Sequence, residues 1–364
     1  MRCISRAKSA ALVCVASISL FTGGCIGGKG ATPVTAYELK NYNQDLYQGK
    51  LYAEELCVAQ NDVALEGYTE DTELHSAALF DLTGERVLYS YKAHERLYPA
   101  STTKIMTALL AIENANLDDQ VTISGNADAS SFPADAQVCG LAKGEVWTLR
   151  DLLGALLLYS GNDAATAIAE YVGGSEEAFV NMMNRRAQEL MANGTHFMNP
   201  HGLHDDNHYT TAYDLYLIFN ECIKHEDFVN IIQSEAYTAY YTDVDGNSQE
   251  ALFTPTNLYA QGEVDVPENV TIVGGKTGTT DEAGYCLILM EKDSSDNPYI
   301  SIVMGASEKP VLYEDMTSLI EGNPVWSAVN VVCESYRIHK KGHLLSGSPF
   351  LFCKHVENTP RIGI

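Results

Sequence analysis

The sequence predicts a mixed α/β fold, in which strands near both ends of one domain join a single sheet and helices fill the middle. Runs with β-type patterning lie at residues 76–91 and return at 270–304, and segments with helical periodicity lie between them. The sequence contains no internal repeat. Strands on both sides of a helical region are typical of a sheet that the chain leaves and rejoins, so we expect helices packed against that sheet.

The composition limits the possible functions. The chain has 364 residues, of which 46% are hydrophobic and 20% are charged. These proportions are typical of a globular protein and exclude a disordered, collagen-like or polytopic membrane protein. The formal net charge of −25 argues against binding to nucleic acid, because phosphate contacts require clustered lysine and arginine.

The N-terminal residues have the pattern of an export signal. Arg2, Arg6 and Lys8 precede an uncharged, largely apolar run at 9–21. This order is typical of a secretory signal, and the run is shorter than the roughly 20 residues of a transmembrane helix. We therefore predict that residues 1–24 are a signal peptide and that the mature chain works outside the cytoplasm.

Cys25 follows this segment directly and is the predicted lipid attachment site. The residues Thr22-Gly23-Gly24-Cys25 resemble the lipobox of bacterial lipoproteins, although Thr22 stands where leucine is preferred. The alternative is simple secretion with Cys25 removed. Residues 25–62 are polar and tyrosine-rich, with glycines at the start, which predicts a tether and a short helix. The expected location is the outer face of the cytoplasmic membrane or the cell-wall space.

The predicted domain at 63–320 begins with a β-hairpin and continues with helices. Runs at 76–81 and 86–91 flank a glycine-containing turn at 82–85. Helical periodicity starts at Ser101, and the apolar residues after it share one broad face: Ile105, Met106, Leu109, Leu110 and Ile112. Further helices are expected at 149–158, 164–172, 176–191 and 212–222, and strands at 270–273, 285–290 and 299–304.

The first motif with chemical meaning is Ser101-Thr102-Thr103-Lys104. Residues at i and i+3 of a helix lie on one face, so the Lys104 amine can reach the Ser101 hydroxyl. A serine needs an adjacent base to act as a nucleophile, and a lysine becomes a base only if burial or a second cation lowers its pKa. Alone, the motif is weak, because a helix cap with a solvated lysine has the same spacing.

Two further motifs follow along the chain. Ser160-Gly161-Asn162 ends an apolar run, and its hydroxyl and amide could relay a proton and hold a carbonyl or a lysine. Lys276-Thr277-Gly278-Thr279 follows the β run at 270–273. Lys276 supplies the second cation, Gly278 permits close backbone approach, and a strand edge there could pair with an extended peptide.

In this order the three motifs resemble those of penicillin-binding proteins and serine β-lactamases. The flanks are similar to those of the low-molecular-mass D-alanyl-D-alanine carboxypeptidases, over about residues 63–320. The similar segments are 98–104, 160–165, 199–203, 208–212 and 276–285. The resemblance implies the serine β-lactamase and DD-peptidase fold, an antiparallel sheet flanked by helices with a helical subdomain.

The resemblance also implies roles for the motif residues. Ser101 would attack the penultimate D-alanine of a peptidoglycan stem peptide, and Lys104 would accept its proton. Ser160 would pass a proton to the leaving amine, and Asn162 would position Lys104. The Ser101 and Thr279 amides would form the oxyanion hole next to Gly278, while Lys276 and Thr277 would hold the terminal carboxylate. β-Lactams would acylate Ser101, and no cofactor or metal is needed.

Several alternatives remain at this point. A β-lactamase of class A would need a glutamate in an E-x-x-L-N loop, which is not found between Ser160 and Lys276. A non-catalytic penicillin-binding lipoprotein would have an inactive Ser101. A zinc peptidase could use the spaced histidines His201, His204 and His208, but these lack the helical H-E-x-x-H pattern.

The tail at 321–364 does not match the resemblance. It contains several basic residues, unlike the acidic domain before it, and only a partial helix at 325–336 is expected. We expect no β-rich C-terminal domain, so a lipid on Cys25 would replace the anchor that such a domain often carries.

Overall fold

A computed structural model describes residues 55–65, 68 and 75–323 of the chain. All of them belong to one compact unit that begins at Glu55. The predicted signal peptide, the lipid site Cys25, most of the tether and the expected helix at 325–336 lie outside the described residues. In the part of the chain that the structure describes, no helix has the length and apolar character needed to cross a membrane.

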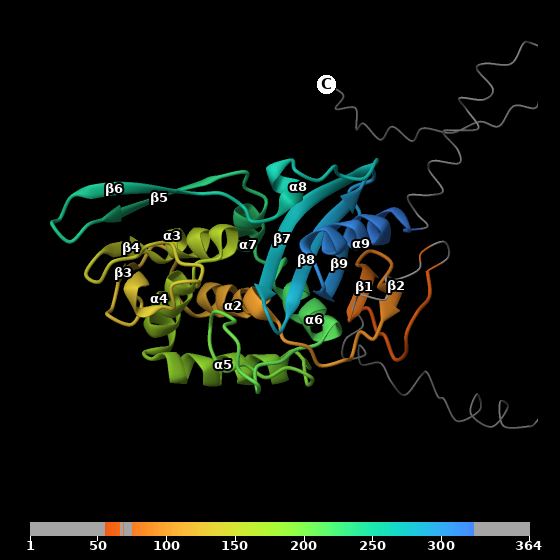
Figure 1. Cartoon of the computed structure of the whole chain (residues 1–364), viewed down its shortest axis with the longest axis horizontal. Helices are drawn as coiled ribbons and strands as arrows, with labels where there is room; N and C mark the ends of the chain where they lie inside the picture. Colours follow the sequence, from red (N-terminus) through yellow and green to blue (C-terminus); the bar gives the residue numbers. More distant parts are fainter. Residues whose placement is uncertain (1–54, 66–67, 69–74, 324–364) are drawn as a thin grey trace, which may run out of the picture. The chain divides into compact units, whose positions relative to one another are not determined.

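A five-stranded antiparallel sheet joins the two ends of the described unit, which confirms the predicted topology (Figure 1). Across the sheet, the strands are β2 (Arg86–Tyr91), β1 (Ser76–Asp81), β9 (Pro298–Ala306), β8 (Gly284–Asp293) and β7 (Val270–Thr280). The two strands of the predicted hairpin have the expected bounds. Because β7 is an edge strand, one side of its backbone is not paired within the sheet.

Helices lie between these strands in the sequence, as predicted. They are α2 (Lys104–Asn114), α3 (Leu149–Gly154), α4 (Asn162–Gly173), α5 (Glu176–Glu189), α6 (Ala212–Cys222), α7 (Glu226–Ile232) and α8 (Leu258–Gln261), and α9 (Lys309–Glu321) follows the last strand. The predicted helix at Ser101 begins as a 3-10 turn, η2 (Ala100–Thr103). The one predicted at 149–158 is α3 followed by a π-helical turn at Ala155–Tyr159.

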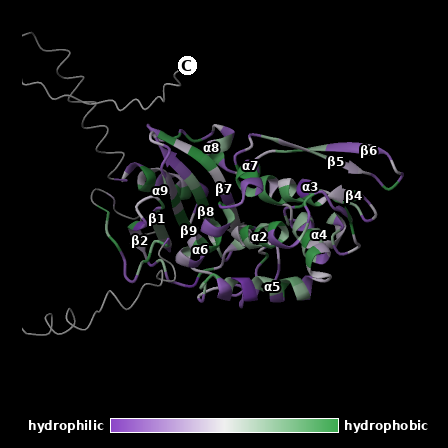
Figure 2. Ribbon diagram, turned by 180° about the vertical axis from the view of Figure 1, so that it is seen from behind, coloured by the Kyte–Doolittle hydropathy of each residue, from purple (hydrophilic) through white to green (hydrophobic). Residues whose placement is uncertain are grey.

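The sheet separates two hydrophobic cores, because neighbouring strand residues point to opposite faces. Phe80, Ile288 and Ile302 pack on the side of the helical region, whereas Leu79, Leu287 and Val303 pack on the other side. On that other side α9 covers the sheet with Leu312, Met316, Leu319 and Ile320. Hydrophobic residues are accordingly frequent in the inner strands and in α2, whereas α5 alternates between hydrophobic and hydrophilic residues (Figure 2).

A second sheet was not predicted from the sequence. It contains β3 (Gln120–Thr122), β4 (Val146–Thr148), β5 (Tyr237–Thr242) and β6 (Ser248–Phe253) in this order. The hairpin of β5 and β6 extends away from the large sheet, and β6 is mostly exposed (Figures 1 and 2). Trp147 and Tyr241 stack with ring centroids 4.2 Å apart and join the hairpin to the short strands.

The third motif lies on a strand rather than after one. The expected strand ended at residue 273, but β7 continues to Thr280 and pairs with β8 as far as Gly284. Lys276, Thr277, Gly278 and Thr279 therefore alternate along a regular strand edge. Because side chains alternate along a strand, the position of each residue on β7 determines which way its side chain points.

Candidate active site

The predicted nucleophile and base lie on one tight turn. Ser101 is in η2 and Lys104 begins α2, and the Lys104 Nζ is 2.8 Å from the Ser101 Oγ. The preceding residue, Ala100, has a positive φ of 46°, which is uncommon for a residue with a side chain. This sharp entry into the turn leaves Ser101 partly exposed while Lys104 is completely buried.

Lys104 is surrounded by three oxygen atoms. Besides Ser101 Oγ, its Nζ contacts the Asn162 Oδ1 at 2.7 Å and the His201 backbone carbonyl at 2.7 Å. Burial, together with the nearby Lys276 cation, holds the pKa of Lys104 well below its usual value. Both causes stabilise the neutral amine relative to the charged one.

This environment orients the amine as a base. A charged lysine has three N–H donors, and loss of one proton leaves two donors and one lone pair. The Asn162 and His201 oxygens can only accept hydrogen bonds from Lys104, so they use the two donors. The lone pair is left facing Ser101, whose hydroxyl can donate to it. Ser101 thereby has a proton acceptor at hydrogen-bond distance, as nucleophilic catalysis requires.

The second motif forms the turn between the π-helical turn and α4. Ser160 has a left-handed backbone with φ 73°, and Asn162 is the first residue of α4. Both side chains are almost entirely buried but line the same cavity as Ser101. The structure thus brings the first two motifs together at one site.

Lys276 joins the third motif to the second. Its Nζ donates to the Ser160 Oγ at 2.9 Å and to the Thr277 backbone carbonyl at 2.8 Å. Burial lowers the pKa of Lys276 to about 7. Lys276 is 1% exposed and faces Ser160, whereas Thr277, Gly278 and Thr279 line the cavity.

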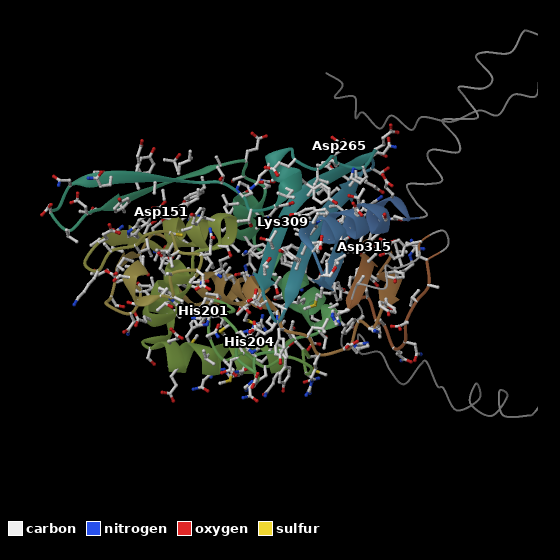
Figure 3. All side chains as sticks on the ribbon, viewed as in Figure 1. Asp151, His201, His204, Asp265, Lys309 and Asp315 are labelled. Carbon is white, nitrogen blue, oxygen red and sulfur yellow. The ribbon has the colours of Figure 1, made fainter. Side chains whose placement is uncertain are left out.

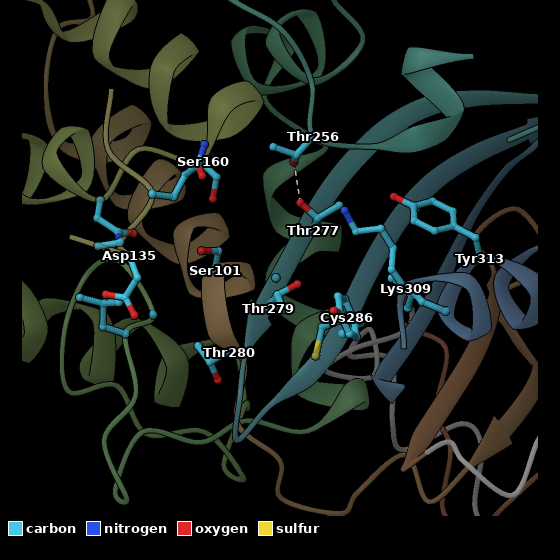
Figure 4. A pocket seen from close by; sticks show the side chains of 18 residues that line it. Ser101, Asp135, Ser160, Thr256, Thr277, Thr279, Thr280, Cys286, Lys309 and Tyr313 are labelled. Atoms are coloured by element: carbon cyan, nitrogen blue, oxygen red, sulfur yellow. Dashed lines mark hydrogen bonds between the residues drawn. The ribbon is translucent and has the colours of Figure 1, made fainter. Parts of the chain in front are cut away.

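A cavity of about 320 Å³ opens in front of Ser101 (Figure 4). The open edge of β7 forms one wall, and the turn at Ser160 forms another. Gly278 packs closely against the nucleophile turn, since a Cβ atom there would lie 3.0 Å from the Ser101 backbone nitrogen. The cavity can hold an extended peptide against a strand edge, with its carbonyl carbon near the Ser101 hydroxyl.

Two contributors to the site were missed by sequence reasoning. The His201 carbonyl is the third oxygen at Lys104, although the sequence drew attention only to the His201 ring. The fully buried Asp163 carboxylate accepts hydrogen bonds from the backbone amides of Cys139, Gly140 and Leu141, at 2.9–3.0 Å. It thereby holds the loop opposite β7. The only sequence signal for Asp163 was its place directly after the second motif.

The three histidines considered as zinc ligands have separate partners. Met198 N donates to the His208 Nδ1, so the His208 Nε2 carries the proton and donates to Thr103 Oγ1 at 2.8 Å. Leu203 N donates to the His201 Nδ1 at 3.2 Å. His204 lies on the same loop as His201 and is 3.3 Å from the Asp206 carboxylate (Figure 3).

Burial lowers the pKa of His201 to about 3 and that of His208 to about 4. Among the described residues, the one group of three ligand side chains that converges is Glu113, Glu221 and His225. Arg186 donates to both of its carboxylates. The structure therefore does not support a zinc site on the three spaced histidines.

A serine paired with a buried lysine, beside a second buried lysine and an open strand edge, is an arrangement typical of serine hydrolases that form an acyl-enzyme. Residues 64–308 match the family model of D-alanyl-D-alanine carboxypeptidases of peptidase family S11, and the chain belongs to this family. The resemblance predicted from the motifs is thus confirmed.

Individual relatives support the same assignment. The chain is 34% identical over 254 residues to the D-alanyl-D-alanine carboxypeptidase DacF of Bacillus subtilis, covering 68% of this chain and 61% of DacF. It is 32% identical over 244 residues to the D-alanyl-D-alanine carboxypeptidase of Streptomyces sp. strain K15, covering 64% of this chain and 81% of that protein. The chain spans about three fifths of the length of DacF and of DacC from Escherichia coli, 61% and 59% respectively.

Solved structures share the fold as well. The Streptomyces K15 DD-transpeptidase superimposes with a TM-score of 0.64 and 28% identity, covering 70% of this chain and 98% of that chain. Penicillin-binding protein 5 from Haemophilus influenzae gives a TM-score of 0.61 and 27% identity, covering 70% of this chain and 72% of that chain. These neighbours confirm the predicted antiparallel sheet flanked by helices.

Proposed function

We propose that this chain is a serine-type D-Ala-D-Ala carboxypeptidase that removes the terminal D-alanine from peptidoglycan stem peptides. The observation that carries the proposal is the contact between Ser101 Oγ and a buried Lys104 amine, at the edge of a strand that can bind a peptide. Family membership supplies the substrate class.

The reaction follows from the site residues. Ser101 Oγ bonds to the carbonyl carbon of the penultimate D-alanine, and its proton passes to Lys104. The Ser101 and Thr279 amides stabilise the oxyanion, at about 3–4 kcal/mol for each donor. Ser160, held by Lys276, donates its hydroxyl proton to the nitrogen of the terminal D-alanine as the peptide bond breaks. The proton that Lys104 took from Ser101 then restores the Ser160 hydroxyl, so both groups end the step as they began. Water then cleaves the ester and restores Ser101, releasing the shortened peptide as its carboxylic acid.

The direct test is release of D-alanine from a purified stem pentapeptide. The wild-type chain is expected to yield the tetrapeptide and one equivalent of D-alanine, measured by mass spectrometry. Ser101→Ala serves as the inactive control. Tetrapeptide formation at the wild-type rate in that variant would reject the assignment of Ser101, and no release by wild type would reject the carboxypeptidase activity.

Penicillin is expected to form a long-lived adduct with Ser101. Within the described lining of the cavity, the one carboxylate is Asp135 and there is no glutamate, in line with the missing E-x-x-L-N sequence. Without such a base, water attacks the acyl-enzyme slowly. Intact-mass spectrometry should show the adduct well after free drug is removed. Rapid multiple turnover of penicillin would favour the β-lactamase alternative.

We infer further that the protein is exported and that a lipid on Cys25 holds it at the outer face of the membrane. The support is the basic and apolar order of residues 1–24 and the small residues before Cys25. Cys25→Ser should move the protein from the membrane fraction to the secreted fraction. Unchanged partitioning would contradict lipidation.

A further inference from the structure

Lys309 is the single cationic side chain among the described residues that line the cavity in front of Ser101. It is the first residue of α9 and is exposed. Within the described part of the chain, its amino group has neither an ion pair nor a side-chain hydrogen bond. Its charge is therefore available to a ligand in the cavity.

The other lysines of the site are already engaged. Lys104 is fully buried and contacts three oxygen atoms, and Lys276 contacts Ser160 and the Thr277 carbonyl. Neither is among the residues that line the cavity. The lowered pKa of Lys276 also reduces its positive charge at neutral pH. The family resemblance implied that Lys276 holds the substrate carboxylate, but Lys309 is the more accessible cation.

Lys309 lines the same cavity as Thr277, the threonine expected to bind that carboxylate. Its side chain extends from the start of α9 toward Thr277 (Figure 4). The Thr277 Oγ1 is 2.5 Å from the Thr256 Oγ1, so the two hydroxyls hold each other in place. Tyr313 lies one helical turn after Lys309 and also lines the cavity, and its hydroxyl accepts a hydrogen bond from Leu258 N at 3.0 Å.

The charges of the cavity also orient a substrate. Asp135, the one acidic residue of the described lining, lies on the opposite side of Ser101 from Lys309 (Figure 4). A carboxylate is attracted toward Lys309 and repelled from Asp135. The leaving D-alanine, which carries the carboxylate, would then lie beside Thr277.

Lys309 has no evident structural role that would explain its position. A cation at the N-terminus of a helix is unfavourable, because the helix dipole is positive there. The first turn of α9 contains no acidic residue to compensate, and the N-cap Glu308 makes no side-chain capping bond. A ligand carboxylate would add to the negative charge that the N-cap Glu308 brings to this end of the helix.

We propose that Lys309, together with the Thr277 hydroxyl, binds the C-terminal carboxylate of the substrate and so determines specificity for a free peptide terminus. This inference rests on the proposed carboxypeptidase function. It adds a specificity-determining residue from α9 to a site otherwise built from the three motifs.

The test compares a stem pentapeptide with its C-terminal amide. Lys309→Met should lower the ratio of kcat/KM for the acid to that for the amide by about tenfold to a hundredfold, as expected when one charge-assisted hydrogen bond is lost. Lys309→Arg should keep most of this ratio because the charge remains. Lys143→Met, at an exposed lysine outside the cavity, should leave the ratio unchanged.

Lys276→Ala separates the two candidate cations. Its amino group contacts Ser160, so we expect kcat/KM to fall for both substrates with the ratio preserved. If Lys276→Ala abolishes the ratio and Lys309→Met does not, the carboxylate binds Lys276 and the proposal is wrong.

A second readout does not depend on the peptidase activity. Benzylpenicillin carries a carboxylate that its methyl ester lacks, and both can acylate Ser101. Lys309→Met should reduce the preference of the acylation rate for the free acid. If wild type cleaves neither peptide, the proposed function fails, while an unchanged penicillin preference would overturn the role of Lys309.

Discussion

Lys104→Arg is expected to lower the rate of acylation by a fluorescent penicillin by about a hundredfold to ten-thousandfold, the usual contribution of a general base. Arginine keeps the positive charge but does not deprotonate in proteins, so it offers no lone pair to the Ser101 hydroxyl. Ser101→Ala removes the oxygen atom that bonds to penicillin, so it should abolish labelling completely. The second-order rate of labelling measures both.

The pH dependence of labelling provides the control. In wild type the labelling rate should rise with pH as Lys104 loses its proton, because only the neutral amine accepts the serine proton. Lys276, with a pKa of about 7, titrates as well, so wild type alone does not identify the group. In Lys104→Arg the labelling rate should not show the increase with pH that deprotonation of Lys104 causes. Lys143→Arg should behave as wild type. Rapid labelling of Lys104→Arg would contradict the role of Lys104 as base.

The motif residues could be predicted from the sequence because their relations are local. Ser101 and Lys104 are three residues apart on one turn, so helical geometry alone brings them together. Ser160 and Asn162 flank a single glycine in a tight turn. That the three motifs meet was inferred from the resemblance, and the contacts of Lys104 with Asn162 and of Lys276 with Ser160 now show it.

Other parts depended on contacts between distant residues. The strand β7 continues through Gly274, Gly275 and Gly278, which have low strand propensity, because pairing with β8 outweighs that preference. The Asp163 bonds to the loop at 139–141 and the His201 carbonyl at Lys104 use backbone groups, which leave no pattern in a sequence. The helix α9 did have a signal, since Pro310 at its start precedes apolar residues at helical spacing.

Gly202→Ala is expected to slow acylation of Ser101, although Gly202 has no side chain that could take part in the reaction. Its φ of +90° is unfavourable for alanine, and a Cβ atom would lie 1.9 Å from the Ala100 carbonyl oxygen. Ala100 already has a positive φ of 46°, so the nucleophile turn has little room to relieve this clash. A shift of about 1 Å in a reacting group can cost a hundredfold in rate. We therefore expect penicillin acylation to fall at least about a hundredfold.

Gly246→Ala separates this clash from the cost of the backbone conformation. Gly246, in the turn between β5 and β6, has a φ of +86°, but a Cβ atom there would meet no atom within 4 Å. Both variants bear the cost of a left-handed alanine, about 1–2 kcal/mol, which thermal unfolding measures. Only Gly202→Ala also pushes on the Ala100 carbonyl next to Ser101. Equal acylation rates in the two variants would show that the nucleophile turn tolerates displacement and that its position does not depend on the 199–203 loop.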